Sequence, residues 1–407
     1  MIPRSMLVGG LGIVASVVLL LVSVGTNDVT SWQRYATAID SIGLVGVYRT
    51  MPLFNHPPLM GYLAWLCHRI SEAVGLPFSI VFRLPSVAAN VGTAFLLLKI
   101  WEARGVDEVA GRAFARYSWS VCAILVGAYH GNTDCLAVFA CMACLYLVEV
   151  GKPPWLAGLA LGAAVNVKVI PVLLFLPLLA TQRTRRSADA FAIGALSGAL
   201  PFAVAWLGAG DDLILNVFRY GSSAELWGLP ALLHGLGAIP GIGADTANAL
   251  RLAYREGIGQ GLTLGSVVLL AVYGYRTGLS AARLMAATFC LFLIFAPGFG
   301  VQYAVYLVAP ALAVSPSWGR RYDLVAGLFI LLTYLHFRQG AFPLRSFHGG
   351  PIPASIAPFG VAAWVLAIAV LWVCLREEER SPPTEVAMCS RTRSCIRAMM
   401  KSEKRTQ

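Results

Sequence analysis

The chain has 407 residues, of which 58% are hydrophobic and only 13% charged, and its formal net charge is +11. A soluble core cannot bury this much apolar surface, since soluble proteins average about half apolar and about a quarter charged residues. Many of the basic residues lie in short loops between apolar runs, which favours the charge bias of membrane-protein loops over nucleic-acid binding.

The apolar runs predict an all-α polytopic membrane protein with about 12 transmembrane helices, since each helix needs roughly 20 apolar residues. Residues 7–24 form the first predicted span, a retained signal-anchor helix. Residues 57–74 are predicted to lie along the outer interface, because a crossing there would place the basic loop 101–112 outside. The segment 155–180 is predicted to form two short helices. The other predicted spans are 80–100, 114–129, 135–150, 188–207, 262–275, 282–296, 303–314, 324–337 and 356–375.

The two short helices of 155–180 are expected to turn at residues 166–171, with Lys168 at the turn. Basic residues stand on both sides of this segment, so the chain must cross twice in a length that suits one long helix. At about 1.5 Å per residue, each arm is shorter than a full bilayer crossing, so Lys168 is expected below the outer surface.

Loop charge also predicts the domain organisation. Residues 1–375 are expected to form one membrane domain with both termini cytoplasmic, in the cytoplasmic (plasma) membrane. Its long external segments are residues 26–79, with juxtamembrane helices, and 208–260. Residues 376–407 form a basic cytoplasmic tail that is expected to be disordered or to touch anionic lipid.

With this topology, unusual polar residues gather at the outer side of the membrane, where acidic and basic groups near hydrocarbon are costly and mark candidate sites. They are Asp28 after the first span, Asn55 and His56 before the interfacial helix, His130, Asn132 and Asp134 between two spans, Lys168 at the turn, and Gln302 and Tyr303 between two further spans.

Each of these residues also has an ordinary structural interpretation. Asp28 can be a solvated residue at a helix end, and Asp134 can cap a helix N-terminus. Lys168 can extend its ammonium group to the interface, while the histidines, Gln302 and Tyr303 can cap and pack. The combination on one side of the membrane therefore matters more than any single member.

The pattern resembles the GT-C superfamily of membrane glycosyltransferases that use polyprenyl-phosphate-linked sugars, nearest to its bacterial mannosyltransferase-like branch. The elements that carry this resemblance are Asp28, the Pro-Pro-Leu element of residues 55–59, Arg83, the Gly-Asn-Thr-Asp of residues 131–134, residues 158–171 with Lys168, and the Gln302-Tyr303 pair. The resemblance implies that Asp28 is the catalytic base. Family members often have two adjacent acidic residues there, whereas this chain has Asn27-Asp28, which leaves open whether Asp28 acts alone or with Asp134.

The chemistry of sugar transfer fits these residue types. A carboxylate such as Asp28 can take the proton of the acceptor hydroxyl, and cations can hold the phosphate of the donor as its negative charge grows. With a single base and no covalent intermediate, the anomeric centre would invert. The residues predicted to bind the donor phosphate are Lys168, Arg83, His56, Gln302 and Tyr303.

Acceptor or sugar contacts are expected from Asn55, His130, Asn132, Arg219, Tyr220 and Trp227. The aromatic residues of segment 216–233 suit sugar faces, but an interfacial aromatic belt is the other interpretation of that segment. The partners expected are the lipid-linked donor, a glycolipid or polysaccharide acceptor and membrane lipid. No cofactor or metal is expected, because the sequence has no Rossmann-like unit, no Gly-rich phosphate loop and no spaced pair of aspartates.

Two other classes of protein share some of these features. A transporter or lipid flippase would also have about 12 spans, but it predicts broken helices at matching positions in two halves and acidic residues near the bilayer midplane. A noncatalytic scaffold would need neither the acidic residue at the mouth of the first span nor the lysine at a helix turn. The one-sided cluster favours the transfer of a hexose, with mannose as the expected sugar, outside the membrane.

Overall fold

The computed structural model describes residues 3–218, 227–237, 243–339, 346–347, 353 and 355–376. The chain divides into two units, residues 1–374 and residues 375–407. Only residues 375 and 376 of the second unit are described, so the predicted tail lies outside the described residues. All that follows concerns the first unit.

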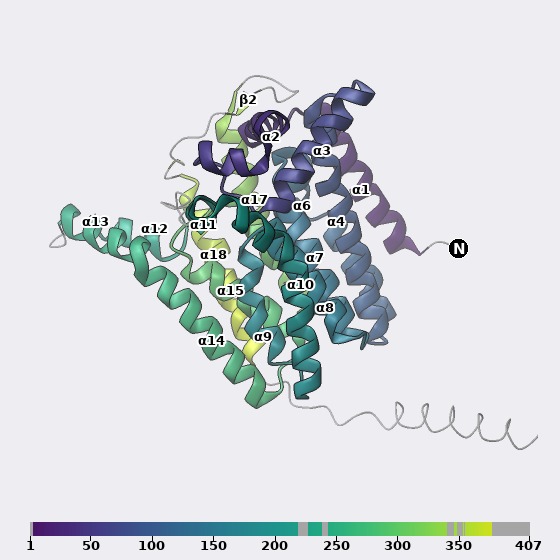
Figure 1. The fold of residues 1–407 in the computed structure, drawn as a ribbon. Coiled ribbons are helices and arrows are strands. Elements are labelled where there is room, and N and C mark those ends of the chain that lie inside the picture. The colour runs from purple at the N-terminus through teal and green to yellow at the C-terminus, as the bar shows by residue number, and fades with distance from the viewer. Residues whose placement is uncertain are drawn as a thin grey trace, which may run out of the picture. The chain divides into compact units, whose positions relative to one another are not determined.

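The described chain is almost entirely helical, which confirms the prediction of an all-α membrane protein (Figure 1). Two-residue strands, β1 (Arg338–Gln339) and β2 (Ser346–Phe347), form one antiparallel pair. The α-helices are α1 (Arg4–Val22), α2 (Asn27–Thr50), α3 (Pro58–Val74), α4 (Phe78–Ala103), α5 (Asp107–Ser118), α6 (Val121–Ile124), α7 (Asp134–Glu149), α8 (Pro154–Val167), α9 (Phe175–Leu179), α10 (Arg185–Ala209), α11 (Asp211–Phe218), α12 (Gly228–Leu236), α13 (Ala244–Ala253), α14 (Gly259–Thr277), α15 (Ala281–Phe295), α16 (Val305–Val314), α17 (Pro316–Phe337) and α18 (Ala357–Leu375).

Short non-α turns extend several of these helices. They are η1 (Leu125–His130), η2 (Ile170–Leu174), η3 (Tyr254–Ile258) and η4 (Val301–Ala304). Within the described residues, five helical segments are long and apolar enough to cross a membrane, namely α1, α4, α10, Asp245–Thr277 and α18. Shorter apolar helices stand at most of the other predicted spans. The total of about 12 crossings stays a prediction.

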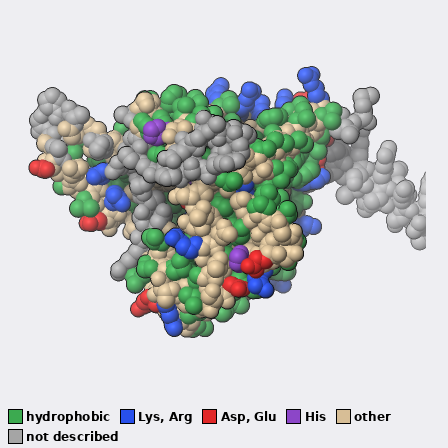
Figure 2. All heavy atoms as spheres, turned by 90° about the horizontal axis from the view of Figure 1, so that it is seen from above, with side chains coloured by type: hydrophobic (Ala, Val, Ile, Leu, Met, Phe, Trp, Pro, Cys, Tyr) green, Lys and Arg blue, Asp and Glu red, His purple; other side chains and the backbone are tan. Residues whose placement is uncertain are grey.

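The first long segment after α1 forms two helices joined by polar contacts. Trp65 of α3 donates a hydrogen bond from Nε1 to Asp40 Oδ1 of α2 (2.9 Å), and Arg69 lies 3.6 Å from the other oxygen of Asp40. Figure 2 looks down on the end of the molecule that carries α2, where charged side chains of both signs lie among apolar ones. The interfacial position of residues 57–74 stays a prediction.

The predicted break in segment 155–180 is confirmed. Helix α8 ends at Val167, Lys168 has an extended backbone, and the chain resumes helical turns at Ile170. Residues at the start of α8 and just after α9 line the same cavity, so the segment returns to the end from which it started. Lys168 therefore stands at the tip of a helical hairpin.

Glycines allow α8 to pack very closely against α10. Gly158 and Gly162 on α8 stand four residues apart, as do Gly194 and Gly198 on α10. A Cβ atom at Gly162 would overlap the carbonyl oxygen of Ala195. This spacing of small residues is a common basis of helix association in membranes. Lipid tails are as apolar as the side chains, so helices associate through close van der Waals packing and not through the hydrophobic effect. Near the tip, Asn166 Nδ2 donates to the carbonyl of Gly198 (2.7 Å), which fixes the end of α8 beside Lys168.

Candidate functional site

The start of α2 is tied to the loop after η1. The Oγ1 atom of Thr26, the N-cap of α2, accepts a hydrogen bond from the N–H of Asp28 (3.3 Å). The same hydroxyl donates to the carbonyl of His130 (3.0 Å), at the end of η1. Helix capping by a threonine thus places the Asp28 carboxylate beside a loop that is about 100 residues away in the sequence.

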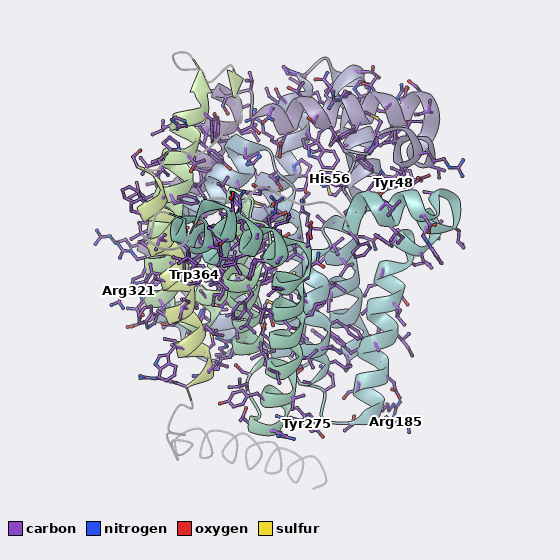
Figure 3. The ribbon with its side chains drawn as sticks, turned by 90° about the vertical axis from the view of Figure 1, so that its left-hand side faces the viewer. Tyr48, His56, Arg185, Tyr275, Arg321 and Trp364 are labelled. Atoms are coloured by element: carbon purple, nitrogen blue, oxygen red, sulfur yellow. The ribbon has the colours of Figure 1, made fainter. Side chains whose placement is uncertain are left out.

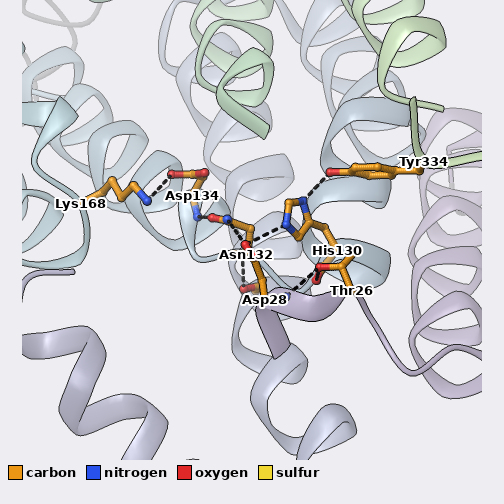
Figure 4. A network of polar contacts seen from close by, with 8 residues as sticks. Thr26, Asp28, His130, Asn132, Asp134, Lys168 and Tyr334 are labelled. Carbon is orange, nitrogen blue, oxygen red and sulfur yellow. Dashed lines mark hydrogen bonds and ion pairs between the residues drawn. The ribbon is translucent and has the colours of Figure 1, made fainter. Parts of the chain in front are cut away.

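Two nitrogen atoms hold one oxygen of the Asp28 carboxylate (Figure 4). His130 Nε2 lies 2.9 Å from Asp28 Oδ2, and Asn132 Nδ2 donates to the same oxygen at 3.2 Å. The Asp28 side chain keeps 39% of its exposure, whereas that of His130 keeps 8%. The carboxylate is therefore oriented from its buried side through Oδ2 and remains accessible on the other side.

His130 is itself oriented by Tyr334 of α17. The Tyr334 hydroxyl lies 2.5 Å from His130 Nδ1. When the hydroxyl donates to Nδ1, the imidazole carries its proton on Nε2 and donates it to Asp28, which is the arrangement that satisfies both contacts with a neutral ring. A chain of hydrogen bonds thus runs from Tyr334, which is buried between the packed helices, through His130 to the carboxylate of Asp28.

A second chain of contacts leads from Asn132 to Lys168 (Figure 4). Asn132 Oδ1 accepts a hydrogen bond from the N–H of Asp134 (3.1 Å), the first residue of α7. Lys168 Nζ lies 3.9 Å from Asp134 Oδ1, and Tyr306 donates its hydroxyl proton to that oxygen (2.9 Å). Asp134 is fully buried, and its Oδ2 atom makes no hydrogen bond with the described residues. The structure therefore brings Asp28, Asn132, Asp134 and Lys168 together, as the sequence predicted.

The charges of this cluster keep Asp28 ionised. Burial raises the pKa of the Asp28 carboxyl, but the electrostatic interaction and the hydrogen bond with His130 lower it, and the interactions with His56 and Lys168 lower it further. The balance puts its pKa at about 2, below the ordinary value of 3.8. Asp28 is thus an anion at any physiological pH, as a proton acceptor must be.

His56 lies in the connection between α2 and α3, outside the spanning helices. Its ring packs at 4.2 Å from the ring of Trp32, between centroids, and the Tyr48 hydroxyl donates to its carbonyl (2.6 Å). Burial, and then the charge of Lys168, hold the pKa of His56 well below its ordinary value, so the ring is neutral. Its Nδ1 atom is buried and has no hydrogen-bond partner within the part of the chain that the structure describes, which is costly unless a ligand supplies one.

Arg83 does not reach this cluster as a free cation, which corrects its prediction as a donor-phosphate ligand. Its side chain is fully buried, and its guanidinium group donates five hydrogen bonds, to the carbonyls of Ser79, Leu20, Ser23 and Ala128 and to the Ser23 hydroxyl. The guanidinium group carries five N–H bonds in all, so no donor is left for a phosphate.

Arg83 instead connects the two loops of the site, the one that leads to Asp28 and the one that contains His130. Leu20 and Ser23 lead into the Asp28 segment, and Ala128 leads into the His130 segment. These carbonyls lie at helix ends, where backbone acceptors lack partners within the helix. The close fit requires glycine at position 131, which has φ of 75° and where a Cβ would lie 2.9 Å from Arg83 Cγ.

Other predicted residues lie around the cluster or apart from it. The ring of Tyr303 lies 6.0 Å from Lys168 Nζ, and Gln302 precedes it in η4. Asn55 is partly buried next to His56. Arg219 and Tyr220 lie outside the described residues.

The structure gives Trp227 a packing role, which corrects its prediction as a sugar-binding surface. Its side chain is 2% exposed and stacks on Phe299 at 4.1 Å between ring centroids. Its indole N–H donates to the carbonyl of Leu293 (2.8 Å). Neither a ring face nor the N–H group is left for a sugar.

Sequence reasoning missed Tyr306 and Tyr334, because both stand in runs that were interpreted only as spans. Tyr306 follows Tyr303 by three residues, which places the two on one face of a helix, so this spacing was an available signal. Tyr334 gives no such signal, because its partner is about 200 residues away. Among the described residues, no group of three or more His, Cys, Asp or Glu side chains is placed to hold a metal ion.

The helices and the cluster together define a membrane protein that presents an oriented carboxylate and a partly buried lysine at one end of its helices. The chain matches the family model of Glycosyltransferase family 87 over residues 54–297, more than half of its length, and it belongs to this family of GT-C-type membrane glycosyltransferases. The predicted resemblance to the GT-C superfamily is thereby confirmed. The search of curated proteins gave no match.

The matched region contains His56, His130, Asn132, Asp134 and Lys168 but begins after Asp28. The family assignment therefore establishes a membrane glycosyltransferase that acts on a sugar donor and an acceptor. It favours this class over the transporter, flippase and scaffold alternatives. The role of Asp28 rests on its contacts.

Proposed function

We propose that this protein transfers a hexose, with mannose as the expected sugar, from a polyprenyl-phosphate-linked donor to a lipid-linked or glycan acceptor. In this proposal the chain crosses the cytoplasmic membrane about 12 times, both termini are cytoplasmic, and the Asp28 cluster faces outward. Its main support is the geometry of Asp28, whose Oδ2 atom takes both hydrogen bonds that hold the carboxylate, from His130 and Asn132. Oδ1 is then the oxygen that can accept a proton.

In the proposed reaction, the acceptor hydroxyl approaches Oδ1 of Asp28. Its oxygen forms a bond to C1 of the sugar while the bond between C1 and the phosphate oxygen breaks, and the electron pair of that bond stays on the polyprenyl phosphate. The hydroxyl proton passes to Asp28 as the new bond forms. The acceptor enters opposite the phosphate and no sugar becomes attached to the enzyme, so the anomeric configuration inverts.

Asp28 is a weak base when its pKa is about 2, and the substrate changes this balance. A bound donor places the negative charge of its phosphate near His130, His56 and Lys168, the groups that lower the pKa of Asp28. A nearby negative charge raises a carboxyl pKa. The carboxylate is therefore expected to become a stronger base when the donor is in place.

Lys168 is the proposed ligand of the donor phosphate. Its Nζ atom lies at the tip of the helical hairpin, 3.9 Å from Asp134 Oδ1, a separation that leaves its strongest hydrogen bonds for another acceptor. Three further residues are proposed to complete the phosphate site: His56, with its buried Nδ1 atom, Tyr303, whose ring lies near Lys168, and Gln302, which precedes Tyr303. These groups are proposed to stabilise the negative charge that develops on the phosphate, and the proposal includes no cofactor or metal.

The remaining predicted residues take supporting parts in this proposal. Asp134 is fully buried, so it is proposed to act with Asp28 by orienting Lys168 and Asn132, and not by contact with the substrate. His130 and Asn132, which were expected to bind sugar, use their side-chain nitrogens on Asp28 and are proposed as positioning residues. Asn55, Arg219 and Tyr220 stay proposed contacts of the sugar or acceptor.

A donor panel tests this function. Purified protein in lipid nanodiscs is supplied with a membrane glycolipid extract as acceptor and with polyprenyl-phosphate mannose, polyprenyl-phosphate glucose or GDP-mannose. We expect transfer from a polyprenyl-phosphate sugar only. In Lys168→Gln, kcat/KM should fall about 10- to 100-fold, because this factor corresponds to the free energy of one hydrogen bond to a charged group.

The matched control is Lys99→Gln, which removes an exposed lysine that pairs with Glu102 on α4 and should change kcat/KM less than about twofold. Transfer from GDP-mannose, or equal loss in the two lysine variants, would contradict the proposal. A comparison of glycans from cells with and without the gene would narrow the acceptor.

A further inference from the structure

A cavity of about 580 Å³ lies at the opposite end of α7 and α8 from the Asp28 cluster. Helix α7 runs from Asp134, in the cluster, to Glu149, which lines the cavity, and its 16 residues span about 24 Å. Figure 3 shows the same separation, with Arg185 and Tyr275 at the lower end of the helices and His56 and Tyr48 near the upper end. The cavity is therefore separate from the proposed catalytic site.

Three turns meet at this cavity, and each brings polar groups. The turn from α7 to α8 contributes Lys152, the link from α9 to α10 contributes Arg183, and the turn from α14 to α15 contributes Ser280. The Ser280 side chain caps α15, whose first N–H groups point out of the helix and have no partners within it. A helix of 15 residues also adds partial positive charge at this end.

The charge of the lining is positive. Glu149 is the one acidic residue among the described residues that line the cavity. The guanidinium group of Arg104 neutralises it with two hydrogen bonds, one to each carboxylate oxygen (2.8 and 3.2 Å). Lys152 and Arg183 then give the lining its net charge, and Arg183 is held there by the carbonyl of Tyr275 (3.5 Å).

The volume of the cavity and the side chains around it limit the kind of ligand that it can bind. Its volume corresponds to roughly 20 water molecules of about 30 Å³ each, which is far more than a phosphate group fills. Trp155 and Tyr275, both exposed, stand at this end of the helices, as aromatic residues do at the level of lipid headgroups. Exposed apolar side chains, among them Leu176 on α9 and Val272 on α14, continue along the helices from there.

We propose that this cavity binds the phosphate headgroup of an anionic phospholipid. Lys152 and Arg183 contact the phosphate, the rest of the headgroup fills the cavity, and the acyl chains lie along α9 and α14. Basic pockets between membrane helices are suited to such headgroups, because anionic lipids attract basic side chains that lie within about one Debye length of the membrane surface, about 8 Å. Lys152 and Arg183 stand at the two ends of the helical hairpin that carries Lys168 at its tip, so the bound lipid would connect these two ends.

Native mass spectrometry of the purified full chain in a neutral detergent tests this proposal. The protein is titrated with phosphatidylglycerol, with phosphatidylcholine and with inorganic phosphate. We expect one high-affinity site for phosphatidylglycerol, which Lys152→Gln together with Arg183→Gln weakens roughly 10- to 30-fold, the effect of two basic residues. The matched control, Arg320→Gln with Arg321→Gln, removes two exposed arginines from the start of α17 and should bind as the parent does.

Equal affinity in both double variants would overturn the proposal, and so would equal affinity for phosphatidylcholine. Displacement of the lipid by millimolar inorganic phosphate would identify a free phosphate as the occupant and overturn the lipid part. A photoactivatable phosphatidylglycerol supplies a second measurement on the unmodified chain, in case the double variant does not fold. Its cross-links from the headgroup should map to residues 148–157, 181–183 and 278–281, and cross-links confined to other segments would contradict the assignment.

Discussion

Replacement of Arg83 by methionine separates a structural role from a role in binding the donor. The change keeps an unbranched side chain but leaves five acceptor contacts unmade, on four carbonyls and one hydroxyl that lie in the interior. An acceptor left without a partner costs about 1–3 kcal/mol, and relief from burying the charged group offsets part of the sum. We therefore expect Arg83→Met to lower the free energy of unfolding by about 3–5 kcal/mol, the usual cost of breaking a buried charged contact.

This cost can be expressed as a change in melting temperature. With about 2.1 cal/mol/K of unfolding entropy per residue, a loss of 3–5 kcal/mol lowers Tm by roughly 4–6 °C. The assay is thermal unfolding of the purified protein in detergent, followed by tryptophan fluorescence. The value of KM for the donor, measured well below Tm, should change less than about threefold, because Arg83 has no N–H left for a phosphate.

Arg69→Met is the matched control. Arg69 is exposed and pairs with Asp40 and Glu72 on the surface, and such pairs are worth less than about 1 kcal/mol. Its Tm should stay within about 1 °C of the parent value. A KM that rises more than about tenfold in Arg83→Met, with a Tm equal to that of Arg69→Met, would refute the structural role and restore Arg83 as a phosphate ligand.

Three further predictions follow from the same geometry. Tyr334→Phe should lower kcat about 2- to 10-fold with KM unchanged, because it removes one neutral hydrogen bond that orients His130, worth about 0.5–1.5 kcal/mol; an unchanged kcat would contradict this. Gly162→Ala should lower the free energy of unfolding by about 1–3 kcal/mol through the overlap with α10. Gly265→Ala, on an open face of α14, should be neutral or stabilising by up to about 1 kcal/mol, and equal effects of the two would refute the close packing. Because the pKa of Asp28 is lowered to about 2, its carboxylate stabilises the folded state above the ordinary value of 3.8 and loses that effect only as the pH falls through 2. The value of kcat/KM should accordingly stay flat from about pH 7 to about pH 5, and an acid limb centred near pH 4, absent from Asp28→Asn, would contradict the lowered pKa.

The sequence predicted those features that depend on local composition. The break at Lys168 was predictable, because basic loops on both sides of residues 155–180 require two short arms and Pro171 follows the turn. The convergence of Asp28, Asp134 and Lys168 was predictable for a similar reason, since loop charge assigns all three to one side of the membrane. The structure bears out their proximity through Asn132.

Contacts between distant segments could not be predicted in this way. Arg83 carries the same charge as Lys168, and only the positions of α1 and η1 reveal that its donors are consumed. Trp227 has the composition of a sugar-binding residue, but Phe299 covers its ring. Tyr334 becomes part of the site only because α17 packs beside His130. These contacts join segments that are far apart in the sequence. They depend on how the helices pack, and no local pattern of residues in a single sequence predicts that packing.

The central claim is that Asp28 is the base of a sugar transfer, and Asp28→Asn tests it most directly. Asparagine keeps the shape of the side chain but cannot take the acceptor proton, so transfer from the polyprenyl-phosphate sugar should fall by about 10²- to 10⁴-fold. Asp40→Asn, which makes the same change on the exposed surface of the same helix, should keep transfer within about twofold of the parent rate. Transfer by Asp28→Asn at the parent rate would contradict the mechanism.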